Sequence, residues 1–138
     1  MLEVAGVRLR VRDTGPKGAP ALIMLHGFGS SLETWEPWAR VLQTDYRVIR
    51  FDLPGTGLSA PDPTGDYTDA RSVEVLAALM DRLGLDRASL IGNSIGGAIA
   101  WTFAAQRPHP TAPRIVAIDH PGNRRVSISP DQRLTTST

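Results

Sequence analysis

Residues 92–97 hold the feature that most constrains the fold of this chain, a Gly-x-Ser-x-Gly pattern followed by another glycine. An apolar run, 88–91, precedes the pattern, and an alanine-rich run, 98–105, follows it. A strand that turns sharply into a helix exposes the hydroxyl of the central residue, which predicts Ser94 as a nucleophile. Side chains at Gly92 and Gly96 would clash with neighbouring backbone, so both glycines are predicted to be structural.

Strand and helix signals alternate along the rest of the chain. The apolar runs 21–25, 46–51 and 114–119 have the composition of buried strands. Apolar residues at helical spacing predict helices over 35–42 and 68–83, the second of them capped by Thr68 and ended by Gly84. This alternation predicts an α/β protein with a mostly parallel sheet and flanking helices. Functional residues then lie at the carboxyl ends of the strands.

The two ends of the sequence carry weaker patterns. Residues 7–12 alternate apolar residues with arginine, which predicts one half-exposed strand. From His120 onward we recognise no apolar periodicity, so the predicted domain covers 1–120 and is followed by a loose segment, 121–138.

Composition excludes several classes of function. The net charge is +1, from 15 basic and 14 acidic residues without a basic block, so neither nucleic acid nor membrane is an expected partner. There is no cysteine, and the 3 histidines lack the spacing of metal ligands, so we expect no metal and no cofactor. The alternating N-terminus is unlike a signal peptide, and the expected location is the cytoplasm.

A glycine-rich loop, His26 to Ser31, follows the strand 21–25 and supplies the second element of a site. Acyl transfer to a serine needs backbone N–H donors aimed at the oxyanion. The expected donors are Ile95, directly after Ser94, and Phe28 in the loop. We expect His26 to brace the loop with no role as a base, and Gly27 to support it.

Residues 55–60 fit the competing pattern G-x-G-x-x-A of dinucleotide-binding proteins, and Glu74 lies near the expected spacing for a ribose-binding acid. Proline-rich sequence follows Ala60 where that motif requires a helix. We therefore interpret the segment as a structural turn, with Asp52 supporting it from the end of the preceding strand.

Taken in order, His-Gly-x-Gly from His26, Asp-x-Pro-Gly-x-Gly-x-Ser from Asp52 and Gly-Asn-Ser-x-Gly-Gly from Gly92 resemble the α/β-hydrolase superfamily. The resemblance covers about residues 2–119 and is nearest to the branch of single-domain bacterial serine esterases and carbon–carbon hydrolases. It implies Ser94 as the nucleophile of a hydrolase of carboxylic esters or related acyl bonds. A serine at this position is unlike the aspartate of the haloalkane dehalogenase and epoxide hydrolase branches.

The resemblance also implies a catalytic histidine on a loop after the last of eight core strands. About six of those strands are recognised here, so the expected fold is an incomplete α/β-hydrolase fold. His109 is predicted to be a surface turn residue. His120 follows a strand at the correct sheet edge and is a candidate base, and Asp119 is a candidate triad acid.

Three hypotheses remain open from the sequence. The chain is an N-terminal portion of a hydrolase with weak or no turnover by itself, or a non-enzymatic module that binds small ligands, or a half-enzyme completed by a separate chain. In the first and third cases the strand 114–119 is an exposed sheet edge that favours self-association. Four large residues are predicted to lie in the core rather than to line a pocket: Phe28, Trp35, Trp38 and Leu58.

Overall fold

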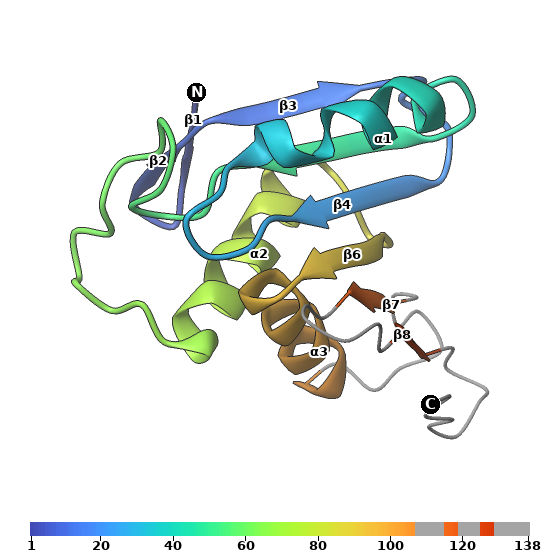
Figure 1. Ribbon diagram of the computed structural model, residues 1–138. Coiled ribbons are helices and arrows are strands. Elements are labelled where there is room, and N and C mark those ends of the chain that lie inside the picture. The colour runs from blue at the N-terminus through green and yellow to red at the C-terminus, as the bar shows by residue number, and fades with distance from the viewer. Residues whose placement is uncertain (107–114, 119–124, 129–138) are drawn as a thin grey trace.

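A six-stranded sheet in the order β3-β5-β4-β6-β7-β8 forms the centre of the computed structural model, which describes residues 1–106, 115–118 and 125–128 (Figure 1). The three central pairings are parallel and the two outer pairings antiparallel, while β1 and β2 form a separate hairpin. The strands are Leu2–Val4 (β1), Val7–Leu9 (β2), Val11–Thr14 (β3), Ala21–Leu25 (β4), Arg47–Phe51 (β5), Ser89–Asn93 (β6), Ile115–Ile118 (β7) and Arg125–Ile128 (β8).

Helices cover both faces of this sheet. The short helix α1 lies on one face after a 3-10 turn, η1, and the longer helices α2 and α3 pack against each other on the opposite face. Their bounds are Leu32–Trp35 (η1), Glu36–Leu42 (α1), Asp69–Arg82 (α2) and Ile95–Gln106 (α3). The predicted α/β class with a mostly parallel sheet and flanking helices is therefore confirmed.

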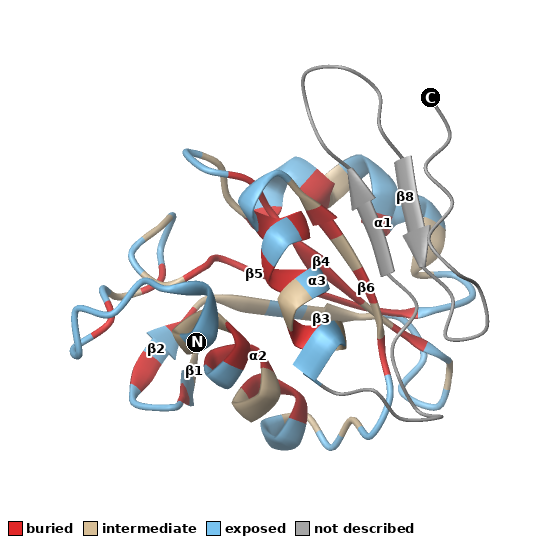
Figure 2. Ribbon diagram, turned by 90° about the horizontal axis from the view of Figure 1, so that it is seen from below, coloured by how far each residue is buried: buried red, intermediate tan, exposed pale blue. Residues whose placement is uncertain are grey.

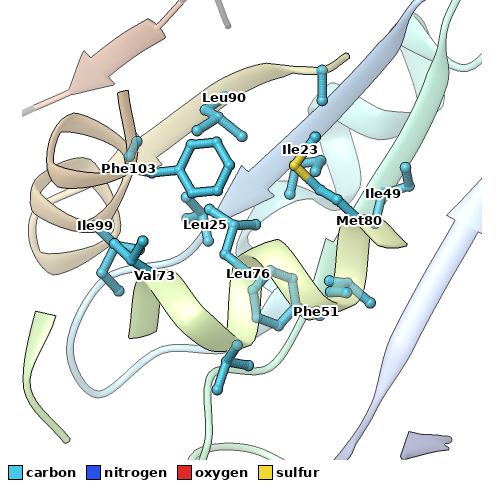
Figure 3. Close-up of a cluster of buried hydrophobic side chains, with 14 of the residues drawn as sticks. Ile23, Leu25, Ile49, Phe51, Val73, Leu76, Met80, Leu90, Ile99 and Phe103 are labelled. Atoms are coloured by element: carbon cyan, nitrogen blue, oxygen red, sulfur yellow. The ribbon is translucent and has the colours of Figure 1, made fainter. Parts of the chain in front are cut away.

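The alternation of side chains along β4 separates two apolar clusters. Ile23 and Leu25 face α2 and α3, where they join the larger cluster drawn in Figure 3. Met24, between them, faces the other way and packs with Trp35 and Val48 under α1. Because both faces of the strand are covered, its sequence is continuously apolar, and buried residues concentrate in the central strands (Figure 2).

The register of the parallel strands brings three loops to one edge of the sheet. Leu25 of β4 pairs with Phe51 of β5 and with Gly92 of β6. The segments that begin at His26 and Asp52 therefore leave the sheet at the same level as the turn that carries Ser94. This arrangement places the candidate site at the carboxyl ends of the strands.

The N-terminal strand prediction is wrong in one respect. Where the alternating pattern predicts one strand, the structure has the hairpin β1-β2 and the separate strand β3. Ala5 and Gly6 have φ of 50° and 80°, which makes a tight hairpin turn of the kind that matches strand twist. After this turn, Val11 starts β3 opposite Phe51 of β5.

The helix predicted over 35–42 begins one residue later, at Glu36. Trp35 ends the preceding 3-10 turn and is buried, as is Ala39. Trp38, which was expected on the same apolar face, is 51% exposed. Its ring packs edge-on against Trp35, with 6.1 Å between the ring centroids.

The segment 121–138, expected to be loose, contains the strand β8, which pairs antiparallel with β7. The expectation of a strandless segment is wrong for Arg125–Ile128. These four residues alternate polar and apolar types, but the run is as short as a recognisable alternation can be. The prediction that the strand 114–119 forms an exposed sheet edge is also wrong. Within the described residues, β8 pairs with β7 along that edge.

Candidate functional site

Ser94 occupies the turn between β6 and α3 in a strained backbone conformation. Its φ is 53°, in the left-handed region that residues with a side chain rarely adopt. The residue is exposed, in contrast to the buried Gly92 and Gly96 on either side of it. A strained, exposed serine between a strand and a helix is the geometry of a nucleophile elbow.

The two flanking glycines leave no room for a side chain. A Cβ at Gly92 would overlap the backbone of Gly96 and Gly97 on the first turn of α3. A Cβ at Gly96 would lie 2.7 Å from the carbonyl oxygen of His26 and closer still to the backbone of Leu25. The turn can therefore pack α3 directly onto the end of β4 only with glycine at both positions.

Backbone N–H groups from two segments lie close to Ser94. A Cβ built on Gly27 would stand 3.5 Å from the Ser94 Cβ, so the loop after β4 touches the turn. No acceptor within the described residues takes the Phe28 N–H. Ile95 is the first residue of α3, so its N–H has no partner within the helix. Both amides therefore belong to segments that meet at the turn of Ser94.

His26 uses both ring nitrogens within the protein. Its Nε2 accepts the backbone N–H of Leu53 at 2.9 Å, with the Thr56 hydroxyl 3.0 Å from the same atom. The ring proton therefore sits on Nδ1, which donates to the Gly27 carbonyl at 2.7 Å. The buried ring ties the loop after β4 to the loop after β5, and its lone pair is not available to Ser94.

Asp52 is fully buried and holds the start of two segments. One carboxylate oxygen accepts the Leu32 N–H at 2.7 Å, and the other accepts the Leu58 N–H at 2.8 Å. The backbone carbonyl of Asp52 accepts the Ser59 hydroxyl at 2.6 Å. The carboxylate thereby fixes the proline- and glycine-rich loop after β5 relative to η1 and the site.

A pocket of about 280 Å³ opens beside this turn. Phe28 and Ile95, which carry the two amides, also line the pocket, and their side chains are 90% and 38% exposed. Val75 of α2 and Ile99 of α3 line it as well, and each is only 1% exposed. The pocket therefore runs from an apolar mouth at the amides to an apolar floor between the two helices.

The other wall of the pocket is polar and comes from the loop before α2 and from the first turn of that helix. Arg71 donates from Nε to the buried carboxylate of Asp62 at 2.7 Å. Asp62 also accepts from the N–H and hydroxyl of Thr64, at 2.9 Å and 2.7 Å. The hydrogen bonds from Arg71 and then Thr64 lower the pKa of Asp62 to about 2, so the carboxylate stays ionised at neutral pH.

Tyr67 joins this wall to the loop after β5. Its hydroxyl accepts the backbone N–H of Asp62 at 3.0 Å. A Cβ at Gly55 would be 3.3 Å from the Tyr67 ring, so the ring lies directly on that glycine. The described residues also show that Gly55–Ala60 closes on itself by a backbone hydrogen bond, and the next helix starts only at Asp69, which is not dinucleotide-binding geometry.

The roles expected from the sequence meet different outcomes at this site. The structure brings together Ser94, Phe28, Ile95 and His26, while Asp119, His120 and His109 lie outside the described residues. Phe28 and Leu58, expected in the core, are exposed, and of these two only Phe28 lines the pocket. Within the described part of the chain, no group of acidic and histidine side chains could hold a metal ion, and no helix is long and apolar enough to cross a bilayer.

The pairing of Asp62 with Arg71, and the place of Tyr67, were missed from the sequence. Residues 62–65 carry a usable signal, because Asp-Pro-Thr-Gly is the sequence of a type I turn with a side-chain acceptor at its first position. That signal predicts the turn, but it does not identify an arginine nine residues away as the partner of the carboxylate.

Residues 20–113 match the family model described as the alpha/beta hydrolase fold. A Bacillus subtilis protein, named as a candidate 2-succinyl-6-hydroxy-2,4-cyclohexadiene-1-carboxylate synthase, is 36% identical over 94% of this chain and 49% of its own length. A 2-hydroxy-6-oxononadienedioate/2-hydroxy-6-oxononatrienedioate hydrolase of Burkholderia vietnamiensis is 42% identical over 75% of this chain and 38% of its own length.

Solved structures show the same fold. Epoxide hydrolase A from Mycobacterium thermoresistibile superposes with a TM-score of 0.78 and 28% identity, covering 89% of this chain and 39% of that one. The chain thus spans half or less of the length of these relatives.

Proposed function

Because the chain belongs to the α/β-hydrolase fold family, we propose that it is the nucleophile-bearing part of a serine hydrolase that acts on carboxylic esters or related acyl bonds. The relatives include hydrolases of several bond types, so the reaction has to be inferred from the site itself. The elbow residue is Ser94, whereas the resemblance implies an aspartate in the epoxide hydrolase branch. A hydroxyl nucleophile beside two amide donors favours acyl transfer.

One observation carries this proposal, the backbone of Ser94. A φ of 53° costs on the order of 1–2 kcal/mol for a residue with a side chain. Glycine at this position would remove that cost, yet the chain has serine there and glycine at both close-packed neighbours. Strain that projects a hydroxyl out of the turn is useful to a nucleophile and has no value to a helix cap.

The geometry supports a two-step acyl transfer. The Ser94 oxygen bonds to the carbonyl carbon of the ester, and the electrons of the C=O double bond move to the carbonyl oxygen. The N–H groups of Phe28 and Ile95 donate hydrogen bonds to this oxyanion. Collapse of this intermediate breaks the bond to the alkoxide, which takes up the proton lost by the serine. Water then releases the acid from the acyl-enzyme by the same sequence of steps.

A base has to carry the proton between these partners. His26 is occupied by its own hydrogen bonds, so it does not serve. Of the remaining histidines, only His120 follows a strand at the edge that carries Ser94, which makes it the first residue to test, with Asp119 as its acid. A base supplied only by another chain would leave the protein with weak turnover, because a triad without its base keeps a small residual activity.

Covalent labelling tests the proposal without requiring turnover. The protein is treated with a fluorophosphonate probe and the modified peptide is identified by mass spectrometry. We expect one adduct, on Ser94, that is absent in Ser94→Ala and retained in Ser89→Ala, which removes a serine from the strand that leads to Ser94. A protein that binds apolar ligands but is never labelled would instead be a non-enzymatic binding module.

A further inference from the structure

We propose that the pocket beside Ser94 takes the acyl chain of an uncharged ester and excludes acyl chains that carry a carboxylate. The inference rests on the proposed function, since it names the substrate class of the same site. It is carried by the residues that line the pocket, by the charges on its polar wall and by its depth.

The path from the nucleophile into the pocket is apolar. Phe28 and Ile95 stand at the mouth, so an ester whose carbonyl oxygen meets their amides has its acyl chain beside their side chains. Deeper in, Val75 and Ile99 close the space between α2 and α3. A volume of about 280 Å³ is just below the range of about 300–1,000 Å³ typical of drug-sized ligands, which suits a single short chain.

The charged residues of the lining oppose an anion. Asp62 and Asp66 contribute two carboxylates, and Arg71 is the single lysine or arginine among the described residues that line the pocket. Hydrogen bonds from the Thr68 side chain and backbone lower the pKa of Asp66, as those from Arg71 and Thr64 do for Asp62. Both groups are ionised at neutral pH. With the positive charge of Arg71, the three side chains carry a net charge of −1, which repels a carboxylate on the bound chain.

Arg71 offsets one of these two negative charges, and its guanidinium already makes four hydrogen bonds. Nε and Nη2 bond to Asp62 at 2.7 Å and 3.4 Å, Nη1 to Glu74 at 3.2 Å, and Nη2 also to the Ala5 carbonyl at 2.7 Å. A substrate carboxylate near this arginine would compete with the buried carboxylate of Asp62, which already takes two of these hydrogen bonds. Two relatives are hydrolases named for carboxylate substrates, so this polar wall predicts a different preference for the present chain.

Val75 is the residue expected to set the length of the chain that fits. It lies at the floor of the pocket, whereas Val73, on the same helix, is buried in the core and is not part of the lining. Shortening either valine to alanine removes the same atoms from α2. Only the change at Val75 should lengthen the pocket.

Binding to the Ser94→Ala protein tests the inference in the absence of any reaction. Dissociation constants are measured by NMR titration for methyl hexanoate, monomethyl adipate and dimethyl adipate, which share one ester end and differ at the other. We expect monomethyl adipate to bind about threefold more weakly than the two uncharged esters, from repulsion by the net negative charge of the polar wall. Asp66→Asn keeps the acceptor for Thr68 and should abolish most of this difference, because it removes the net charge of the wall.

Two further variants connect the binding to the pocket itself. In the Ser94→Ala background, Val75→Ala should tighten methyl octanoate relative to methyl hexanoate, and Val73→Ala should leave that ratio unchanged. Equal or tighter binding of monomethyl adipate, a change of ratio in Val73→Ala alone, or no binding of any ester would overturn the inference. Fluorophosphonate labelling of the wild-type protein reports separately on the proposed function, so the two can fail independently.

Discussion

The two walls of the pocket are built in different ways. The wall that carries Ser94 is held by close contact between backbone segments, with Gly96 against the carbonyls that end β4. The opposite wall is held by side chains, through the ion pair of Asp62 with Arg71 and the hydroxyl of Tyr67. A wall made of packed backbone tolerates no added atom but does not titrate, whereas a wall made of charged side chains tolerates substitution and responds to pH.

Gly96→Ala should have the largest effect on stability, because it adds an atom to the backbone-built wall that carries Ser94. The added Cβ would overlap the backbone of Leu25 and His26, and we expect the free energy of unfolding to fall by about 3 kcal/mol or more. Urea denaturation followed by circular dichroism measures the change. Gly18→Ala is the matched control, since a Cβ there meets nothing within 4 Å, and a comparable loss in both variants would refute this account of the turn.

Low pH should weaken the side-chain-built wall, because protonation of Asp62 removes its pairing with Arg71. The pKa of Asp62 is about 2 in the folded chain, below its usual value of 3.8, so the pairing stabilises the fold fully above pH 3.8 and is lost as the pH falls toward 2. Asp62→Asn removes this contribution while Asp66 and Glu74 remain beside Arg71.

Urea midpoints of the wild type and of Asp62→Asn, measured between about pH 5 and pH 2, test this linkage. The wild type should be more stable at the upper end, and the difference should shrink as the solution is acidified. A difference that stays constant over the whole range would show that the Asp62 pairing is not the titrating element.

Tyr67→Phe should have a smaller effect on the same wall. It removes the hydroxyl that accepts the Asp62 N–H but keeps the ring on Gly55, and we expect a loss of about 1 kcal/mol in the free energy of unfolding. Tyr46→Phe serves as the control, because the Tyr46 hydroxyl makes no hydrogen bond within the described residues. Equal stability of Tyr67→Phe and the wild type would mean that water replaces the hydroxyl without cost.

Relief of strain at Ser94 should give the smallest change in the free energy of unfolding, and this change should stabilise the protein. Ser94→Gly releases the left-handed conformation but adds freedom to the unfolded chain, for a net gain of about 0.5 kcal/mol in the free energy of unfolding. Ala5→Gly, with a φ of 50°, should give a similar gain while keeping the fluorophosphonate label that Ser94→Gly loses. A less stable Ser94→Gly protein would contradict the assignment of strain to this residue.

The same contrast explains what the sequence could predict. The backbone-built wall depends on residues that are close in sequence to a glycine pattern, so Ser94, its flanking glycines and the loop from His26 to Phe28 could all be recognised. The side-chain-built wall depends on a long-range pairing, since the Arg71 guanidinium reaches Asp62 and the carbonyl of Ala5. Charged residues in a loop and on the first turn of a helix carry no pattern that specifies such partners.

The errors in the predicted fold also have local causes. The predicted strand 7–12 is interrupted at Arg10, whose backbone N–H donates to the Ser59 hydroxyl and whose carbonyl accepts the Asp52 N–H. Alternation within the run cannot predict these two contacts. Trp38 lies at helical spacing from the buried Trp35, but Trp35 belongs to a 3-10 turn, which changes the angle between the two residues.

The central claim, that Ser94 is a nucleophile served by the amides of Phe28 and Ile95, is tested most directly by the crystal structure of the phosphonylated protein. The phosphoryl oxygen of an adduct stands in for the oxyanion of the acyl intermediate. We predict phosphorus on the Ser94 oxygen and the phosphoryl oxygen within about 2.7–3.1 Å of both backbone nitrogens. An adduct on another residue, or one on Ser94 whose oxygen points away from both amides, would contradict the account.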